Sequence, residues 1–170
     1  MTINNTNSYK LPTTDHRPST TDYRLPTTDY RLISDRQKPT MNKTIKLLNL
    51  PKIEDDRGNL TFLQEETHIP FKVERVFWTY DVPGGQQRGG HAYHKQEEII
   101  IALSGSFDVV ITNSNGKKET FQLNRSYNAI YIPPKTWRHI ENHSTNAVSL
   151  HLSSHKFDAE DYIRNIQDLK

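Results

Sequence analysis

The sequence predicts an all-β domain of the antiparallel sandwich or barrel class, and three observations carry this prediction. From residue 41 onward, apolar and polar side chains alternate with period two in several short runs. Turn-forming residues, mainly Gly, Pro and Asn, separate these runs at short intervals. Only residues 158–170 show a helical period. We therefore expect one β domain over residues 41–170, closed by a short C-terminal helix.

The first 40 residues differ in character from the rest of the chain. They contain the similar seven-residue units YKLPTTD, HRPSTTD, YRLPTTD and YRLISDR. A seven-residue period is typical of coiled coils, but proline inside the units and the lack of an apolar pair exclude a helix. We predict that residues 1–40 form a disordered tail. Met41 is then a candidate for the true start of the protein.

The strands are predicted in order from alternation and turn signals. An Asn115-Gly116 pair indicates a hairpin turn, because its backbone needs positive φ. In the last strand, Val148, Leu150 and Leu152 share one face. The expected strands lie in MNKTIKLLNL (41–50), KVERVFWTYDV (72–82), both halves of EEIIIALSGSFDVVIT (97–112), NAIYI (128–132) and AVSLHLSS (147–154).

The C-terminal helix is predicted from the segment DAEDYIRNIQDLK. Asp158 is a suitable N-cap, because its carboxylate can accept from the first free backbone N–H groups. The apolar residues that follow fall at helical spacing, namely Tyr162, Ile163, Ile166 and Leu169.

Composition excludes several classes of function. The tail carries six basic and four acidic residues, which leaves 16 of each in residues 41–170. A neutral domain lacks the basic surface of a nucleic-acid-binding protein. The chain has no cysteine, so disulfides and thiol chemistry are excluded. No apolar run is long enough to span a membrane or to serve as a signal peptide. We expect a soluble cytoplasmic protein.

The most informative stretch is RGGHAYHKQEEIIIALSGSF, residues 88–107. A histidine-bearing strand before a Ser-Gly turn resembles the cupin superfamily, and six residues separate Glu98 from Gly105, as its metal-binding pattern requires. That pattern also needs two histidines on one strand face, whereas His91 and His94 are three residues apart and point to opposite faces. We therefore expect no metal, with His94 at the surface. The alternative is a metal held by His91, Glu98 and His139.

Longer segments give a more specific resemblance. The segments ERVFWTYDVPGGQQRGGHAYHKQEEIIIALSGSFDVVI, LNRSYNAIYIPPKTWRHIENHSTNAVSLHL and DAEDYIRN, with the preceding EDDRGNLTFLQEETHIPFKVERVF, resemble the nucleotide-sugar 3,4-ketoisomerases. This resemblance spans about residues 43–170. It implies a small jelly-roll cupin that acts as a homodimer, without metal or other cofactor, on a dTDP-4-oxo-6-deoxyhexose. It also implies a role in deoxysugar and aminosugar biosynthesis for lipopolysaccharide or S-layer glycans.

Two site residues follow from the resemblance. His91 matches the first histidine of the family's HAH motif, which is the catalytic acid–base. Tyr93 stands where the second histidine is common.

The chemistry supports the same two residues. Moving a carbonyl from C4 to C3 requires a base that removes the C3 proton and returns it to C4 of an enediolate. Histidine suits this role, because its pKa lies near working pH. Tyr93 can donate or accept a proton at the sugar oxygens. Both side chains are expected on one face of one strand.

Six further residues are candidates for substrate binding. Arg88 is the first candidate for the diphosphate and Arg57 the second, because planar guanidinium groups bind phosphate oxygens in pairs. The other candidates are Tyr80, Tyr131, Trp137 and His139.

Two other functions remain open. One is a 3,5-epimerase on the same substrate class, which uses a histidine base and a tyrosine acid. The other is a non-catalytic sugar-binding cupin, in which His91 only hydrogen-bonds the ligand. The stereochemistry at C4 of the product is not fixed by the sequence.

Overall fold

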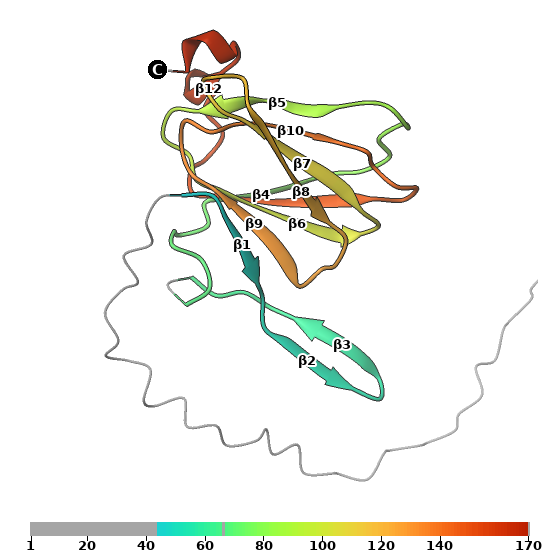
Figure 1. The fold of residues 1–170 in the computed structure, drawn as a ribbon. Coiled ribbons are helices and arrows are strands. Elements are labelled where there is room, and N and C mark those ends of the chain that lie inside the picture. The colour runs from blue at the N-terminus through green and yellow to red at the C-terminus, as the bar shows by residue number, and fades with distance from the viewer. Residues whose placement is uncertain (1–43, 66, 170) are drawn as a thin grey trace, which may run out of the picture. The chain divides into compact units, whose positions relative to one another are not determined.

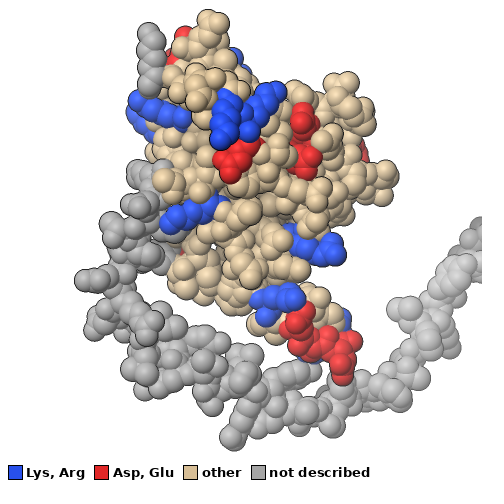
Figure 2. All heavy atoms as spheres, viewed as in Figure 1, with Lys and Arg blue, Asp and Glu red and all other residues tan. Residues whose placement is uncertain are grey.

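The computed structural model describes residues 44–65 and 67–169. The predicted tail over residues 1–40 and the question of Met41 lie outside these ranges. Within them the chain is almost entirely β-structure, as predicted, and none of its helices is long and apolar enough to cross a membrane. Lysines, arginines and acidic residues are interspersed on the face seen in Figure 2.

Two five-stranded antiparallel sheets face each other and form the body of the domain (Figure 1). The first sheet has the order β1-β9-β6-β11-β4 and the second has the order β12-β5-β10-β7-β8. The strands of the first sheet are β1 (Lys46–Asn49), β4 (Arg75–Thr79), β6 (Glu98–Ser104), β9 (Asn128–Ile132) and β11 (Val148–Ser153). Those of the second sheet are β5 (Arg88–Tyr93), β7 (Phe107–Thr112), β8 (Lys118–Leu123), β10 (Trp137–Glu141) and β12 (Tyr162–Ile163).

The predicted alternation is confirmed in the first sheet. In β4 the side chains of Arg75, Phe77 and Thr79 are half-buried, whereas Val76 and Trp78 are exposed. The hairpin predicted at Asn115-Gly116 joins β7 to β8, with Gly116 at φ 82°. Because successive side chains point to opposite sides of a strand, every second side chain points into the space between the sheets.

Two apolar cores hold the domain. The core between the sheets has ten buried residues: Ile100, Ala102, Phe107, Val109, Ile111, Leu123, Ile130, Ile132, Ile140 and Ala147. The other core lies on the opposite face of the first sheet, where Ile99, Ile101 and Tyr131 pack under Ile69 and Phe71. The two faces of β6 therefore belong to different cores, and its near-continuous apolar run is explained by burial on both sides.

A separate hairpin consists of β2 (Lys52–Asp55) and β3 (Gly58–Thr61). It projects from the body at the end remote from β5 and β12 (Figure 1). Nearly all its residues are exposed, including Ile53 and Leu60. An isolated two-stranded sheet is marginal in water, so this hairpin presents apolar surface without a core of its own.

The predicted C-terminal helix is wrong. The segment forms two 3₁₀ turns, η2 (Ala159–Asp161) and η3 (Ile166–Asp168), on either side of β12. Asp158 does cap η2, as expected, by accepting from the N–H of Glu160. Pairing of β12 with β5 buries Ile163 against Ala92 in the second sheet. A helix this short is marginal in water, so these tertiary contacts decide the local structure.

Candidate active site

The candidate site lies between the sheets and is centred on His91 and Tyr93 of β5. The rings of the two residues meet edge to face with centroids 4.9 Å apart, so the predicted sharing of one strand face is confirmed. His94 is exposed and has left this face, also as predicted. Across the ladder, Arg138 of β10 pairs with His91 and therefore faces the same interior. Arg138 was not among the predicted site residues.

A bulge in β5 lets the Arg138 side chain lie close to the β5 backbone. The register between β10 and β5 shifts between Arg138 and Ile140, and Gly89 has φ +69°. The Gly89 carbonyl accepts from Arg138 Nη1 at 2.6 Å. A Cβ at Gly89 would lie 3.0 Å from that same nitrogen. Glycine is needed here both for the left-handed backbone and for this close contact.

Arg138 is held by a buried carboxylate. Its Nε and Nη2 donate to Glu98 Oε2 at 2.9 and 2.7 Å, and both side chains are almost completely buried. The other oxygen of Glu98 accepts from His151 Nδ1 at 3.1 Å, and His151 Nε2 lies 3.0 Å from Ser149 Oγ. Ser149, His151, Glu98, Arg138 and His91 therefore form one connected polar chain between the sheets.

The electrostatics of this chain keep Glu98 ionised. Burial alone would raise the pKa of its carboxyl, but the charge of Arg138 and the hydrogen bond from His151 outweigh burial and lower that pKa to about 2. A buried charge pair is stable only when both partners and their hydrogen bonds are present. The Glu98–Arg138 pair thus fixes the guanidinium that faces His91.

His91 is held in the neutral form. Burial, and next the positive charge of Arg138, lower the pKa of its imidazole from 6.5 to about 3. Arg138 Nη1 lies 2.7 Å from His91 Nε2. Because a guanidinium can only donate, Nε2 is the acceptor and the ring proton resides on Nδ1. The lone pair that could take a proton from carbon is therefore the one that contacts Arg138.

Tyr162 of β12 completes the cluster. Its ring centroid is 4.7 Å from that of His91 and 4.8 Å from that of Tyr93. The hydroxyls of Tyr93 and Tyr162 are 3.4 Å apart. Tyr162 was assigned to the predicted helix and was therefore not among the predicted site residues.

The two arginines predicted to bind phosphate lie apart from this cluster. Arg57 sits at the turn of the β2–β3 hairpin, where it forms a two-point ion pair with Asp55 at 2.7 and 3.2 Å. Arg88 is exposed at the first position of β5, and its charge contributes to lowering the pKa of His143. Only Arg88 is near the site in sequence, three residues before His91 on the same strand.

The remaining four predicted binding residues also lie elsewhere. Tyr131 is fully buried in the core on the other face of the first sheet, where its hydroxyl donates to Glu97 at 2.5 Å. Tyr80 follows β4 and is exposed. Trp137 and His139 flank Arg138 on β10 and alternate to the opposite face, where His139 contacts Glu141 at 3.1 Å. Because side chains alternate along a strand, Arg138 faces the site and its two neighbours do not, although only the neighbours were predicted to bind substrate.

The alternative metal site is not assembled. Both oxygens of Glu98 are occupied by Arg138 and His151, and His139 faces away from His91. Among residues 44–65 and 67–169, no three His, Cys, Asp or Glu side chains are grouped so that they could hold a metal ion.

Comparisons with known proteins agree with this description. Residues 43–170 match the family model described as FdtA, WxcM-like, C-terminal. A curated relative, the TDP-4-oxo-6-deoxy-alpha-D-glucose-3,4-oxoisomerase of Aneurinibacillus thermoaerophilus, is 34% identical over 125 residues, which cover 74% of this chain and 89% of the relative.

Two solved structures are also similar. The WlaRB TDP-quinovose 3,4-ketoisomerase from Campylobacter jejuni is 37% identical with a TM-score of 0.70, covering 75% of this chain and 98% of that one. A 3,4-ketoisomerase from Helicobacter canadensis is 30% identical with a TM-score of 0.71, covering 75% and 96%.

The fold and the His91 cluster define a small cupin-like domain with a cluster of polar and aromatic side chains between two sheets. With a family model matched over residues 43–170, the chain belongs to the FdtA family of WxcM-like C-terminal domains.

Proposed function

We propose that the protein is a 3,4-ketoisomerase that moves the keto group between C4 and C3 of a TDP-4-oxo-6-deoxyhexose. The observation that carries this proposal is the contact between half-buried His91 and buried Tyr93 on one strand face of a domain whose relatives are named as 3,4-ketoisomerases. A neutral histidine beside the fixed charges of Arg138 and Glu98 is suited to cycle a proton between two adjacent carbons.

His91 is the proposed carbon acid–base. It takes the proton from C3, the C3–H electron pair forms the C3–C4 double bond, and the C4 carbonyl electrons move to O4. The resulting enediolate takes up a proton at O4 and gives up the proton at O3. The O3 electrons then form the C3 carbonyl, the electron pair of the C3–C4 double bond moves to C4, and C4 takes the proton back from His91. The net change is one hydrogen from C3 to C4 and one from O3 to O4, so no external oxidant or cofactor is needed.

Arg138 is the proposed stabiliser of the negative charge on the enediolate. His91 Nε2 must exchange its contact with Arg138 Nη1, at 2.7 Å, for the C3 proton. The guanidinium N–H released by this exchange can turn to the oxygen on which charge develops. Preorganised donors of this kind are a large source of rate enhancement in acid–base enzymes. Glu98 would hold the rest of the guanidinium in place during the exchange.

Arg88 remains the proposed ligand of the substrate diphosphate, because it is exposed at the start of the strand that carries His91. Replacing it with alanine should weaken the binding of dTDP itself, without the sugar, by about 2–5 kcal/mol if the pair is desolvated. Isothermal titration with dTDP measures this, and Arg125→Ala provides an exposed control on the β8–β9 connection. Unchanged affinity in Arg88→Ala would place the phosphates elsewhere, with Arg57 the next candidate.

Proton NMR in heavy water separates the proposed function from its alternatives. With the 4-keto substrate, a 3,4-ketoisomerase moves the carbonyl and introduces deuterium at C3 and C4. A 3,5-epimerase introduces it at C3 and C5. A sugar-binding module introduces none and leaves the substrate unchanged. Deuterium at C5, or a carbonyl that stays at C4, would contradict the proposal.

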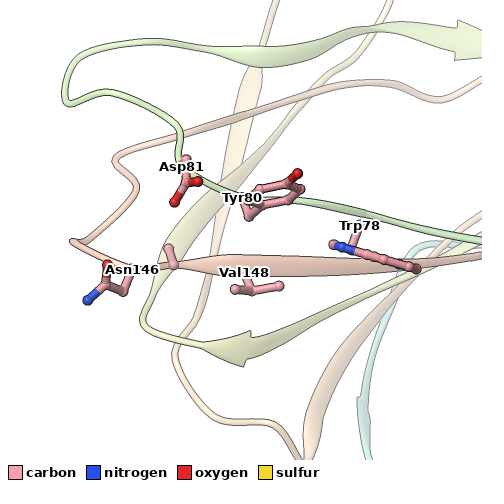
Figure 3. Close-up of a pocket in the computed structure, with 6 residues that line it drawn as sticks. Trp78, Tyr80, Asp81, Asn146 and Val148 are labelled. Atoms are coloured by element: carbon pink, nitrogen blue, oxygen red, sulfur yellow. The ribbon is translucent and has the colours of Figure 1, made fainter. Parts of the chain in front are cut away.

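We also propose that the protein acts as a homodimer. The outer face of the edge strand β4 carries exposed Val76 and Trp78, followed by exposed Tyr80. Trp78 and Tyr80 wall an open pocket of about 280 Å³ with Val148 and its neighbours (Figure 3). Exposed apolar surface of this kind marks interaction sites on soluble domains. The apolar side chains of the β2–β3 hairpin offer a matching surface on a second copy.

Sedimentation of the full chain tests the dimer. Trp78→Glu should shift the protein toward monomer, whereas Lys118→Glu on the other sheet's edge strand β8 should not. A dimer unaffected by Trp78→Glu would remove this face from the interface.

The reaction product has a carbonyl at C3, which a sugar aminotransferase could consume. We propose a place in aminosugar biosynthesis for surface glycans, with the nucleotide-linked sugar processed in the cytoplasm.

A further inference from the structure

The C-terminal segment places a second tyrosine hydroxyl beside the first. Tyr162 stands directly opposite Tyr93 in the β12–β5 ladder. Their hydroxyl oxygens are 3.4 Å apart, and both rings lie against His91. Directly opposed residues on one sheet face are the closest cross-strand neighbours, so the pairing register itself brings the two hydroxyls together.

The position of Tyr162 is fixed by the residues on either side of it. Asp161 is buried, and its carboxylate accepts from the backbone N–H groups of Lys95 and Gln96 at 2.8 and 3.1 Å. The Asp161 carbonyl accepts from the N–H of His94 at 2.9 Å. On the other side, Ile163 is buried. These contacts tie β12 to the loop that leaves β5, so Tyr162 is held in register with Tyr93.

The proposed isomerisation creates a need for two hydroxyls. The oxygen chemistry removes a proton from O3 and adds one to O4. A single tyrosine must donate and accept at two different sugar oxygens through one atom. Two hydroxyls in contact can divide these tasks, because one donates to O4 while the other accepts from O3 and a proton passes between them. Each hydroxyl then gives one proton and gains one, so both end the cycle neutral.

We propose that Tyr162 is a second catalytic acid of the reaction, whose hydroxyl forms with that of Tyr93 a relay that carries the proton from O3 to O4 of the sugar. This inference rests on the proposed 3,4-ketoisomerase function and assigns a role to a residue in the C-terminal segment. Burial, and then the charge of Glu98, raise the pKa of the Tyr93 hydroxyl, which favours a neutral relay member.

The test uses Tyr162→Phe in the full-length protein, because phenylalanine keeps the ring against His91 and removes only the hydroxyl. Three quantities are measured: turnover, dTDP affinity, and deuterium entry at C3 relative to product formation. Turnover should fall by about 10²-fold, the lower end of the range for general acid–base catalysis. Affinity for dTDP should change less than twofold. Exchange at C3 relative to product should rise, because His91 still removes the proton while the oxygen step is slow.

Tyr93→Phe and the double variant sharpen the test. If the hydroxyls act as one relay, the double variant should be no slower than the slower single variant, because effects within a functional unit are not additive. Tyr127→Phe, at the β8–β9 connection, is the matched control and should leave turnover unchanged.

Full turnover in Tyr162→Phe would overturn the relay, and so would fully additive losses in the double variant. A loss of turnover without any rise in the ratio of C3 exchange to product would also overturn it, because that pattern indicates a purely structural role. Failure of the underlying function looks different: wild-type protein would then show neither C3 exchange nor movement of the carbonyl.

Discussion

The space between the two sheets is divided into an apolar half and a polar half, although the same strands build both. On β6, Glu98 belongs to the polar half, and Ile100, two residues later on the same face, belongs to the apolar half. On β10, Arg138 and Ile140 divide in the same way. A step of two residues along a strand therefore separates the candidate site from the core that supports it.

The two halves are stabilised differently. In the apolar half, each side chain contributes through burial, and a neighbour can adjust to a small change in volume. In the polar half, each group depends on a particular partner, because an unpaired buried charge costs several kcal/mol. The apolar half should therefore tolerate conservative substitution, and the polar half should not.

The largest effect is expected from Glu98→Gln. This change keeps the shape of the side chain but leaves the Arg138 guanidinium buried without its counter-charge. Removing one partner of a buried pair costs about 3–5 kcal/mol, whereas Ile100→Val in the apolar half should cost about 0.5–1.5 kcal/mol. Urea unfolding of both variants measures the difference. Equal losses of stability would mean that the two halves do not differ in the way described.

The next largest effect is expected on catalysis. His91→Asn keeps a hydrogen-bonding side chain but cannot cycle a proton at neutral pH. It should bind dTDP normally, lose about 10²–10⁴-fold in turnover and stop deuterium entry at C3. Tyr93→Phe should lose less, because water can also carry the oxygen proton. Continued C3 exchange in His91→Asn would remove His91 from the role of carbon base.

The sequence predicted much of this arrangement where a period of two applied. The strands, the shared face of His91 and Tyr93 and the separation of His94 all follow from alternation. Arg138 was missed because its neighbours Trp137 and His139 were chosen as the binding candidates on this strand. Sequence fixes which residues share a face but not which face is interior, and a shift of one residue exchanges the two.

Two other differences have a tertiary origin. Tyr131 was predicted to bind the substrate, but its hydroxyl donates to Glu97 and its ring packs in the core. Tyr162 was assigned to a helix because the apolar residues around it recur at helical spacing, and no local pattern in the sequence indicated a strand. The pairing of β12 with β5 depends on a loop more than 60 residues away, which no local pattern contains.

A smaller effect is expected from acid. His91 has a lower pKa in the folded protein, about 3, than its ordinary value of 6.5, so the unfolded chain takes up its proton first as the pH falls. The contribution of neutral His91 to the free energy of unfolding is therefore fully present above about pH 6.5, and it is lost as the pH falls toward 3. Glu98, with a pKa lowered from 4.5 to about 2, loses its contribution only below about pH 4.5.

These separate windows allow the two groups to be distinguished. Between pH 6.5 and 4.5, the melting temperature of the wild type should fall more than that of His91→Asn, by a few degrees, since about 1 kcal/mol corresponds to roughly 2–4 °C in a domain of this size. His143, whose pKa is also lowered by burial and by Arg88, is present in both proteins and cancels in the comparison. Parallel curves over this range would contradict the depressed pKa of His91.

The smallest effect is expected from removing metal ions. Glu98, the carboxylate that a metal site would need, already has one oxygen on Arg138 and the other on His151. A divalent ion would have to displace the buried guanidinium, which would then lose its only carboxylate partner among the described residues. Prolonged dialysis against a chelator should therefore leave turnover within measurement error, and elemental analysis should find well under one equivalent of metal. If activity were lost and one particular metal restored it, the polar half would have to rearrange around a metal ion. The Glu98–Arg138 pair would then not be what holds the polar half together.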